Sequence, residues 1–209
     1  MCRSIVICAV CIALGSSGCD TSPQEIVDAS PPVPSSSRVF PDDGADLAYF
    51  GSAVAVSGGL LAVGASGDDS GGLDSGAVYI FAREGTEWVR KARLRPEDAA
   101  AGDHFGAAVA LADSTLVVGA TGSAHEGVRN AGAVYILEQR DIGWVQTAKL
   151  VAPDREHGDE FGSSVSLSGG MLAIGARSDD ADGFNTGSIY IFQRDGGGWK
   201  PLSSARLTR

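Results

Sequence analysis

The chain has 209 residues and a formal net charge of −10, with 26 acidic residues against 16 Lys and Arg. An acidic chain repels phosphate backbones, so the charge argues against nucleic-acid binding. The 29 glycines and the lack of a helix-period apolar pattern favour many short strands joined by turns. The cysteines are Cys2, Cys8, Cys11 and Cys19. Their position excludes a disulfide framework, a thiolate metal site and a catalytic cysteine in the rest of the chain.

Residues 1–19 have the layout of a secretory signal. Arg3 precedes an apolar run from Ile5 to Leu14, which is too short to span a bilayer as a stable helix. Small residues follow, and the sequence SSGC that ends at Cys19 resembles a bacterial lipobox, in which the cysteine is lipidated and becomes the mature N-terminus. We therefore expect secretion across a bacterial inner membrane and a lipid anchor on Cys19 in the cell envelope. An ordinary cleaved signal is the alternative.

Residues 20–37 are rich in proline and serine and poor in apolar side chains. Such a segment cannot bury a core, so we expect a disordered, partly extended tether. The folded part of the chain is predicted to occupy residues 38–209.

One sequence unit occurs three times in this folded part. Each copy opens with a block that begins Phe-Gly and ends Gly-Ala, at residues 50–65, 105–120 and 161–176. A second block, GAVYI or GSIYI, follows in every copy, and a tryptophan stands twelve residues after the first glycine of that block. The copies are spaced by 55 and 56 residues, and such regular repetition indicates a repeat architecture.

Each unit is predicted to contain four antiparallel strands. The first alternates large and small side chains, with Val54 and Val56 opposite Ala53 and Ala55, so its small side should lie close to a neighbour. A two-residue turn leads to the second strand, and a polar loop leads to the third. The second and third strands are apolar on both faces, so other parts of the protein should cover both faces. The fourth carries Lys and Arg and should form the exposed outer edge, where Pro201 is tolerated.

Four such strands describe a blade of a β-propeller. We predict an all-β fold, a partial β-propeller of three four-stranded antiparallel blades at about 50–95, 105–150 and 161–207. Closed propellers have about four to eight blades, so apolar faces should be open at Val54 and Val56 or at Val165 and Leu167. Three explanations stay open: a truncated piece of a longer propeller, self-association that completes a ring, and an open assembly that needs a partner.

The units resemble FG-GAP repeats, the blades of the integrin α-subunit propeller and of many bacterial secreted proteins. The resemblance is carried by Phe50, Gly51, Gly64, Phe105, Gly106, Gly119, Phe161, Gly162 and Gly175. It implies the fold strongly and the function weakly. In the calcium-binding members an Asp-rich loop joins the first two strands. The corresponding turns here, such as Ser57-Gly58-Gly59, lack the oxygen ligands that Ca²⁺ needs.

Acidic residues gather in the loops that a propeller places at one end. The candidate metal ligands among them are Asp68, Asp69 and Asp74 in the first copy and Asp179, Asp180 and Asp182 in the third. Their spacing does not match a calcium loop with a distal bidentate acid, so we expect no cofactor, with Ca²⁺ as the alternative. We interpret these acidic loops as solvated surface; a binding face for a cationic partner is the alternative.

No catalytic constellation stands out in the sequence. His104, His125 and His157 are too widely spaced in the sequence for a zinc site. The sequence also shows no nucleophile-elbow glycine pattern around a serine that could work with a histidine. The tyrosines and tryptophans that recur at equivalent positions are interpreted as packing between blades, with sugar stacking as the alternative. We therefore expect a non-catalytic secreted or envelope-anchored binding module with a protein or glycan ligand. A lectin-like glycan-binding propeller and an accessory module of an enzyme are the alternatives.

Overall fold

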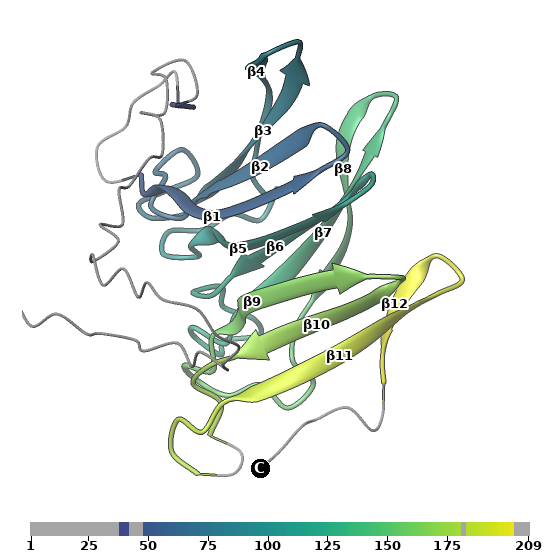
Figure 1. Cartoon of the computed structure of the whole chain (residues 1–209). Coiled ribbons are helices and arrows are strands. Elements are labelled where there is room, and N and C mark those ends of the chain that lie inside the picture. Colours follow the sequence, from purple (N-terminus) through teal and green to yellow (C-terminus); the bar gives the residue numbers. More distant parts are fainter. Residues whose placement is uncertain (1–37, 42–47, 181–182, 203–209) are drawn as a thin grey trace, which may run out of the picture. The chain divides into compact units, whose positions relative to one another are not determined.

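A computed structural model describes residues 38–41, 48–180 and 183–202 (Figure 1). All of them belong to one compact unit, residues 35–209. The predicted signal, the predicted lipidation site Cys19 and the predicted tether lie outside the described residues, as does Asp182. Within the described ranges, no helix is long and apolar enough to cross a membrane.

The described strands form three four-stranded antiparallel sheets, each with its strands in sequence order. The strands are β1 (Phe50–Ser57), β2 (Leu60–Ala65), β3 (Ala77–Glu84), β4 (Glu87–Leu94), β5 (Phe105–Ala112), β6 (Thr115–Ala120), β7 (Ala133–Arg140), β8 (Gly143–Leu150), β9 (Phe161–Ser168), β10 (Met171–Ala176), β11 (Ser188–Asp195) and β12 (Gly198–Pro201). This topology confirms the predicted all-β fold of three blades. Figure 1 shows the three sheets one after another in chain order.

The sheets pack on one another through their first strands, because β5 contacts β1 and β2 and β9 contacts β5 and β6. Val109 and Leu111, on the large side of β5, pack into a cluster with Val78 and Ile80 of the first sheet. Ala110, on the small side, packs against the cluster of the third sheet. The alternation of large and small residues therefore fits each first strand between two sheets.

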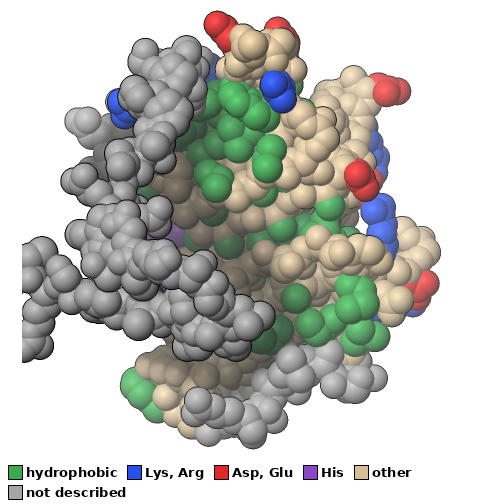
Figure 2. Space-filling view, in the orientation of Figure 1, with side chains coloured by type: hydrophobic (Ala, Val, Ile, Leu, Met, Phe, Trp, Pro, Cys, Tyr) green, Lys and Arg blue, Asp and Glu red, His purple; other side chains and the backbone are tan. Residues whose placement is uncertain are grey.

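The outer faces of the first and third sheets, at the two ends of this series, carry exposed apolar side chains, unlike the faces between sheets. Val54 and Val56 of β1 are 65% and 67% exposed. Of the two predicted alternatives, the open face at Val54 and Val56 is confirmed, whereas Val165 and Leu167 pack against the second sheet. The open face of the third sheet instead carries Ile189, which is 41% exposed. Figure 2 shows hydrophobic side chains at the surface over the first and third sheets.

The Phe-Gly motif is a β-bulge at the start of each first strand. The pairing of β5 with β6 shifts register between Phe105 and Ala108, just where Gly106 adopts a φ of 95°. A Cβ atom on Gly106 would lie 2.6 Å from the carbonyl oxygen of Ala77 in the preceding sheet. Glycine is therefore required both by the positive φ and by the close approach of two backbones.

A second glycine of each unit lies beneath the Phe-Gly motif of the next sheet. A Cβ atom on Gly64 would lie 2.1 Å from the Gly106 oxygen, and one on Gly119 would lie 2.0 Å from the Gly162 oxygen. We call this contact, Phe-Gly of one sheet on Gly-Ala of the preceding sheet, the seam. No side chain fits into it, so the sheets approach as closely as their backbones allow.

Gly119→Ala is therefore expected to lower the free energy of unfolding by about 3 kcal/mol, because the new methyl group overlaps a carbonyl oxygen and forces the sheets apart. The matched control is Gly175→Ala, where the new atom would meet only the Ser164 hydroxyl, at 2.4 Å, and that side chain can rotate. The control should cost about 1 kcal/mol or less. Urea unfolding in dilute solution measures both values, and equal losses would contradict the seam.

Candidate functional site

The long β2–β3 loops and the crossovers between sheets meet at one end of the blades, which we call the loop end. It comprises residues 66–76, 95–104, 121–132, 151–160, 177–180 and 183–187. The Gly102 amide of the first crossover donates to the Leu73 oxygen at 2.8 Å, and the Gly122 amide donates to the Asp103 oxygen at 3.1 Å. Loops of neighbouring repeats are thus joined by backbone hydrogen bonds into one connected surface.

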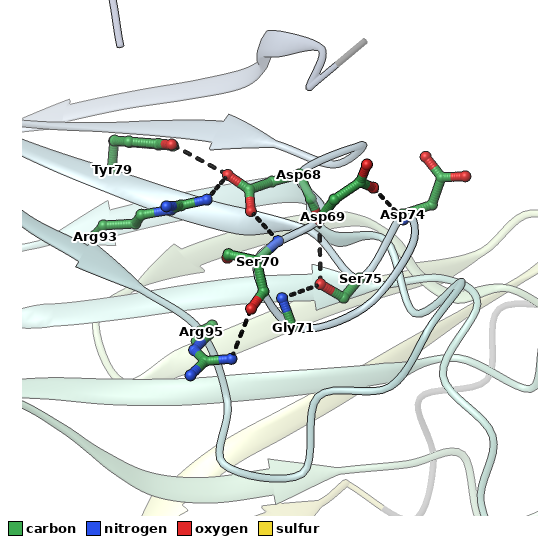
Figure 3. A network of polar contacts seen from close by, with 9 residues as sticks. All are labelled: Asp68, Asp69, Ser70, Gly71, Asp74, Ser75, Tyr79, Arg93 and Arg95. Carbon is green, nitrogen blue, oxygen red and sulfur yellow. Dashed lines mark hydrogen bonds and ion pairs between the residues drawn. The ribbon is translucent and has the colours of Figure 1, made fainter. Parts of the chain in front are cut away.

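Asp68 is the centre of a polar network in the first sheet (Figure 3). Its buried carboxylate accepts hydrogen bonds from the Tyr79 hydroxyl at 3.1 Å and the Ser70 amide at 2.9 Å, and it pairs with Arg93. Burial alone would raise the pKa of Asp68, but the bonds from Ser70 and Arg93 outweigh burial and hold the pKa below its usual value. This carboxylate therefore stays ionised and is committed to the fold.

The second sheet contains a related network around Tyr135. The Tyr135 hydroxyl donates to Asp98 at 3.1 Å, and the Lys149 ammonium donates to the other oxygen of Asp98 at 2.7 Å. Burial would lower the pKa of Lys149, but its bonds to Asp98 and Tyr135 raise it overall. Ser123 stands here at the position that Asp68 occupies in the first sheet.

The third sheet places two carboxylates around its tyrosine. The Tyr190 hydroxyl lies 2.8 Å from an oxygen of Asp154 and 2.6 Å from an oxygen of Asp179. Burial raises the pKa of Tyr190, and both carboxylates raise it further. The third strand of every sheet therefore carries a tyrosine whose hydroxyl is bonded to an aspartate of the loop end.

The same tyrosines pack against the phenylalanine of the Phe-Gly motif in their own sheet. The rings of Tyr79 and Phe50 meet edge to face at 5.4 Å, and the equivalent pairs in the second and third sheets are 5.4 and 5.3 Å apart. The tryptophans Trp88, Trp144 and Trp199 pack against the three core clusters. The recurring aromatic residues are therefore packing residues, but the ring contacts join a tyrosine and a phenylalanine of the same sheet and not, as was predicted, of two blades. Each tyrosine links a Phe-Gly motif to the loops above it.

Four of the six aspartates predicted as candidate metal ligands, Asp68, Asp69, Asp179 and Asp180, accept hydrogen bonds from the protein itself. Asp69 accepts a hydrogen bond from the Asp74 amide at 2.8 Å, and Asp180 accepts one from the Asn185 amide. Asp68 and Asp179 lie in the tyrosine networks. Among the residues that the structure describes, no group of three or more His, Cys, Asp or Glu side chains is placed to hold a metal ion. A calcium site that includes Asp182 stays a hypothesis.

The β1–β2 turn, the place of the calcium loop in calcium-binding FG-GAP repeats, does not fit that ion here. The turn consists of Gly58 and Gly59, with φ values of 55° and 80°, and the equivalent turn of the third sheet is also two glycines. Neither turn brings a carboxylate, and Ca²⁺ takes six to eight oxygen ligands.

Four aspartates of the loop end are buried, which the sequence analysis did not predict: Asp68, Asp103, Asp159 and Asp179. The side chain of Asp103 accepts the Ala100 amide at 2.8 Å, and that of Asp159 accepts the Glu156 amide at 2.6 Å. Burial raises the pKa of both residues. The interpretation as solvated surface is wrong for these four. A signal existed, because Asp103 and Asp159 both stand two residues before a Phe-Gly motif.

The three histidines serve separate loop segments. His104 lies with its Nδ1 atom 3.3 Å from the Ser66 oxygen, and His157 accepts the Arg129 amide through Nδ1 at 3.0 Å. His125 lies beside Glu126, with 3.9 Å between Nε2 and the carboxylate. The contacts of His104 and His157 join separate loop segments, whereas that of His125 lies within one loop.

Large apolar side chains are exposed at two equivalent positions of the loop end. Leu73 and Phe184 each stand three residues before the first glycine of the second block, and Arg129 occupies this position in the second repeat. Leu73 is 69% exposed and Phe184 is 87% exposed. The sequence analysis did not single them out, since one apolar residue within a polar loop is a weak signal.

Asp68→Ala is expected to lower the free energy of unfolding by about 2–3 kcal/mol, because it removes an ion pair and leaves the Tyr79 hydroxyl and the Ser70 amide without their acceptor. The control is Asp69→Ala, which removes an exposed carboxylate and should cost less than about 1 kcal/mol. Urea unfolding measures both variants. A loss for Asp68→Ala no larger than that of the control would contradict the network.

The lowered pKa of Asp68 also predicts a pH dependence. Ionised Asp68 stabilises the fold fully above its unfolded pKa of about 3.9, and this contribution is lost as the pH falls through the lower folded-state pKa. The difference in unfolding free energy between the wild type and Asp68→Asn should therefore be constant above about pH 5 and shrink below about pH 4. Urea midpoints measured across this range test the sign; a gap that widens on acidification would contradict it.

A family model described as the FG-GAP repeat matches residues 35–81, 88–137 and 144–192. No curated protein matches the chain significantly. The second and third matched units begin in the fourth strand of one sheet and end in the third strand of the next, so each contains one Phe-Gly motif and the Gly-Ala end that follows it. Val39, which aligns with Leu94 in the sequence, packs against the cluster of the first sheet in the same manner. Because the matched units cover more than half of the 209 residues, the chain belongs to the FG-GAP repeat family, and its repeats form three blades of a β-propeller.

Proposed function

We propose that the protein is a non-catalytic binding module that is secreted, held at the cell envelope by a lipid on Cys19, and engaged with a protein partner through its loop end. The observation that carries this proposal is the pair of exposed apolar side chains, Leu73 and Phe184, at equivalent tips of the loop end. Apolar side chains with a polar rim are typical of surfaces that bind proteins.

The rigidity of the loop end supports a binding role. The exposed tips stand on loops that are fixed by backbone hydrogen bonds between repeats and by the buried aspartates beneath them. Asp74 and Asn185, next to Leu73 and Phe184, both adopt a left-handed φ, 52° and 51°, a conformation that Asp and Asn tolerate well. A surface ordered before it meets its partner loses little conformational entropy on binding.

Two observations favour a protein ligand and no catalysis. Sugar stacking needs exposed aromatic faces, but the recurring Tyr79, Tyr135 and Tyr190 are buried against the phenylalanines of the Phe-Gly motifs, which leaves Phe184 as the one exposed aromatic side chain of the described loop end. General acid–base chemistry needs a carboxylate or histidine free to meet a substrate. The buried aspartates of the loop end instead accept hydrogen bonds from the protein itself.

The experiment compares two variants for retention on envelope vesicles of the producing cell, in a Cys19→Ala background that removes the lipid. Leu73→Asp combined with Phe184→Asp should reduce retention about tenfold or more, as expected for apolar anchors. The control is Ile142→Asp, which changes an exposed residue in the β7–β8 turn, at the opposite end of the blade.

Treatment of the vesicles distinguishes the ligand classes in this experiment. Protease should abolish retention and periodate should leave it unchanged if the ligand is a protein. Loss after periodate alone would identify the lectin-like alternative. Equal retention of the double variant and the Ile142→Asp control would contradict binding through the loop end.

The anchor is tested by the Cys19→Ala variant in the producing cell. A lipid on Cys19 is the only membrane attachment that this proposal invokes, so the variant should move from the membrane fraction to the soluble extracytoplasmic fraction. Asp20→Ala, one residue further along, is the control that keeps the cysteine. Membrane association of Cys19→Ala equal to that of the wild type would contradict the anchor.

A further inference from the structure

The third sheet carries a groove built like a seam. It is lined by Ser163, Ser164, Gly175, Thr186, Gly187 and Ile189, among others. The equivalent surface of the first sheet holds the Phe-Gly motif of β5, and that of the second sheet holds the motif of β9. No strand of the described residues lies in the groove of the third sheet.

The glycines show that the two occupied seams and the groove differ only in their occupant. A Cβ atom on Gly76 would lie 2.1 Å from the Phe105 oxygen of the next sheet, and the same distance recurs at Gly132. At Gly187 the nearest atom is the oxygen of Arg177, 3.1 Å away in the same sheet's own loop. The groove thus keeps the glycine that a close strand requires.

A serine hydroxyl and an apolar side chain also differ between the occupied seam of the first sheet and the groove of the third sheet. The Ser52 hydroxyl of β1 donates across the seam to the Gly106 oxygen at 3.1 Å. Ser163, at the equivalent position, donates instead to Gly175 of its own sheet at 3.1 Å. Val78 of the first sheet is fully buried, whereas the equivalent Ile189 is largely exposed. Ile189 is thus open to a strand that enters the groove, and the Ser163 hydroxyl would exchange its bond within the sheet for one to that strand.

The matching strand is β1 of the first sheet. Gly51 has the φ of 94° that marks the bulge in the other sheets, yet a Cβ atom there would meet nothing within 4 Å. Tyr49 adopts a φ of 51°, close to the 55° of His104 at the equivalent position in the occupied seam. With Val54 and Val56 exposed, β1 has the docking conformation but no described sheet against it.

We propose that the groove of the third sheet binds β1 of a second copy of this chain, head to tail. The Phe50 amide of one copy would donate to the Thr186 oxygen of the other, as Phe105 donates to Ser75 at 2.9 Å within the chain. Val54 and Val56 would cover Ile189. Both halves of the contact are present in every copy, so the interface is heterologous, and two copies joined at both ends supply about six blades, a number that closes a propeller.

This interface is separate from the loop-end binding proposed above and is tested separately. Sedimentation of the full chain in mild detergent should give twice the mass of one chain. Val54→Asp and Ile189→Asp should each weaken the association about tenfold or more, while circular dichroism stays as in the wild type, because both residues are exposed. Urea unfolding should match the wild type only at concentrations at which the wild type is monomeric, because the dimer interface adds to the apparent stability. Gly175→Ala should also weaken it, since its methyl group takes the place of the incoming Gly51 oxygen. Ile142→Asp should keep the dimer.

Mixing the variants tests the head-to-tail geometry. Val54→Asp has an intact groove and Ile189→Asp has an intact β1, so an equimolar mixture should form a dimer through one junction. A monomeric wild type at all concentrations would overturn the proposal, as would association that persists in both variants. A wild-type dimer that is lost in both variants and not restored by mixing would show a symmetric contact and would also overturn it.

Discussion

Each sheet is held to the next by a contact between two backbones. The Phe-Gly bulge of one sheet lies on the Gly-Ala end of the second strand of the preceding sheet. The two backbones are so close that a Cβ atom on Gly64 would lie 2.1 Å, and one on Gly119 2.0 Å, from a carbonyl oxygen of the bulge. The motif's phenylalanine packs against the tyrosine of the third strand of its own sheet, at Phe50 as well as in the two seams. The tyrosine hydroxyl then bonds an aspartate of the loop end. The seam therefore determines the stacking of the blades, and the phenylalanine and tyrosine connect each Phe-Gly motif to the loops.

The division between repeated and variable residues follows from this arrangement. Glycine, phenylalanine and tyrosine recur in every repeat because the close backbone contact and the ring contact beside it require these residues at their positions. The exposed tips are Leu73, Arg129 and Phe184, which share a position but not a chemistry. A surface of this kind keeps its scaffold constant while the contacts offered to a partner vary from blade to blade. Binding specificity is thus expected to lie in the tips, with the seams providing the rigidity.

Much of this structure could be predicted from the sequence, because period-two alternation and threefold repetition report directly on strands and blades. The side on which Val165 packs was not predictable, since alternation separates two faces of a strand without saying which neighbour lies on each. The burial of Asp68 and Asp179 was also missed. Polar loop residues look alike in sequence whether they face water or a tyrosine hydroxyl, and the partner Tyr79 stands eleven residues from Asp68, in another element.

Hydrogen exchange at the seam amides tests the central claim most directly. The amides of Phe105 and Phe161 donate across the seams to the oxygens of Ser75 and Ala131, both at 2.9 Å. If the seams hold the blades together, these two amides should exchange only when the whole fold opens, with the same protection as the central strands β2 and β6. Exchange of both amides at the rate of an exposed loop, while β2 and β6 stay protected, would show that the blades separate freely and would contradict the account.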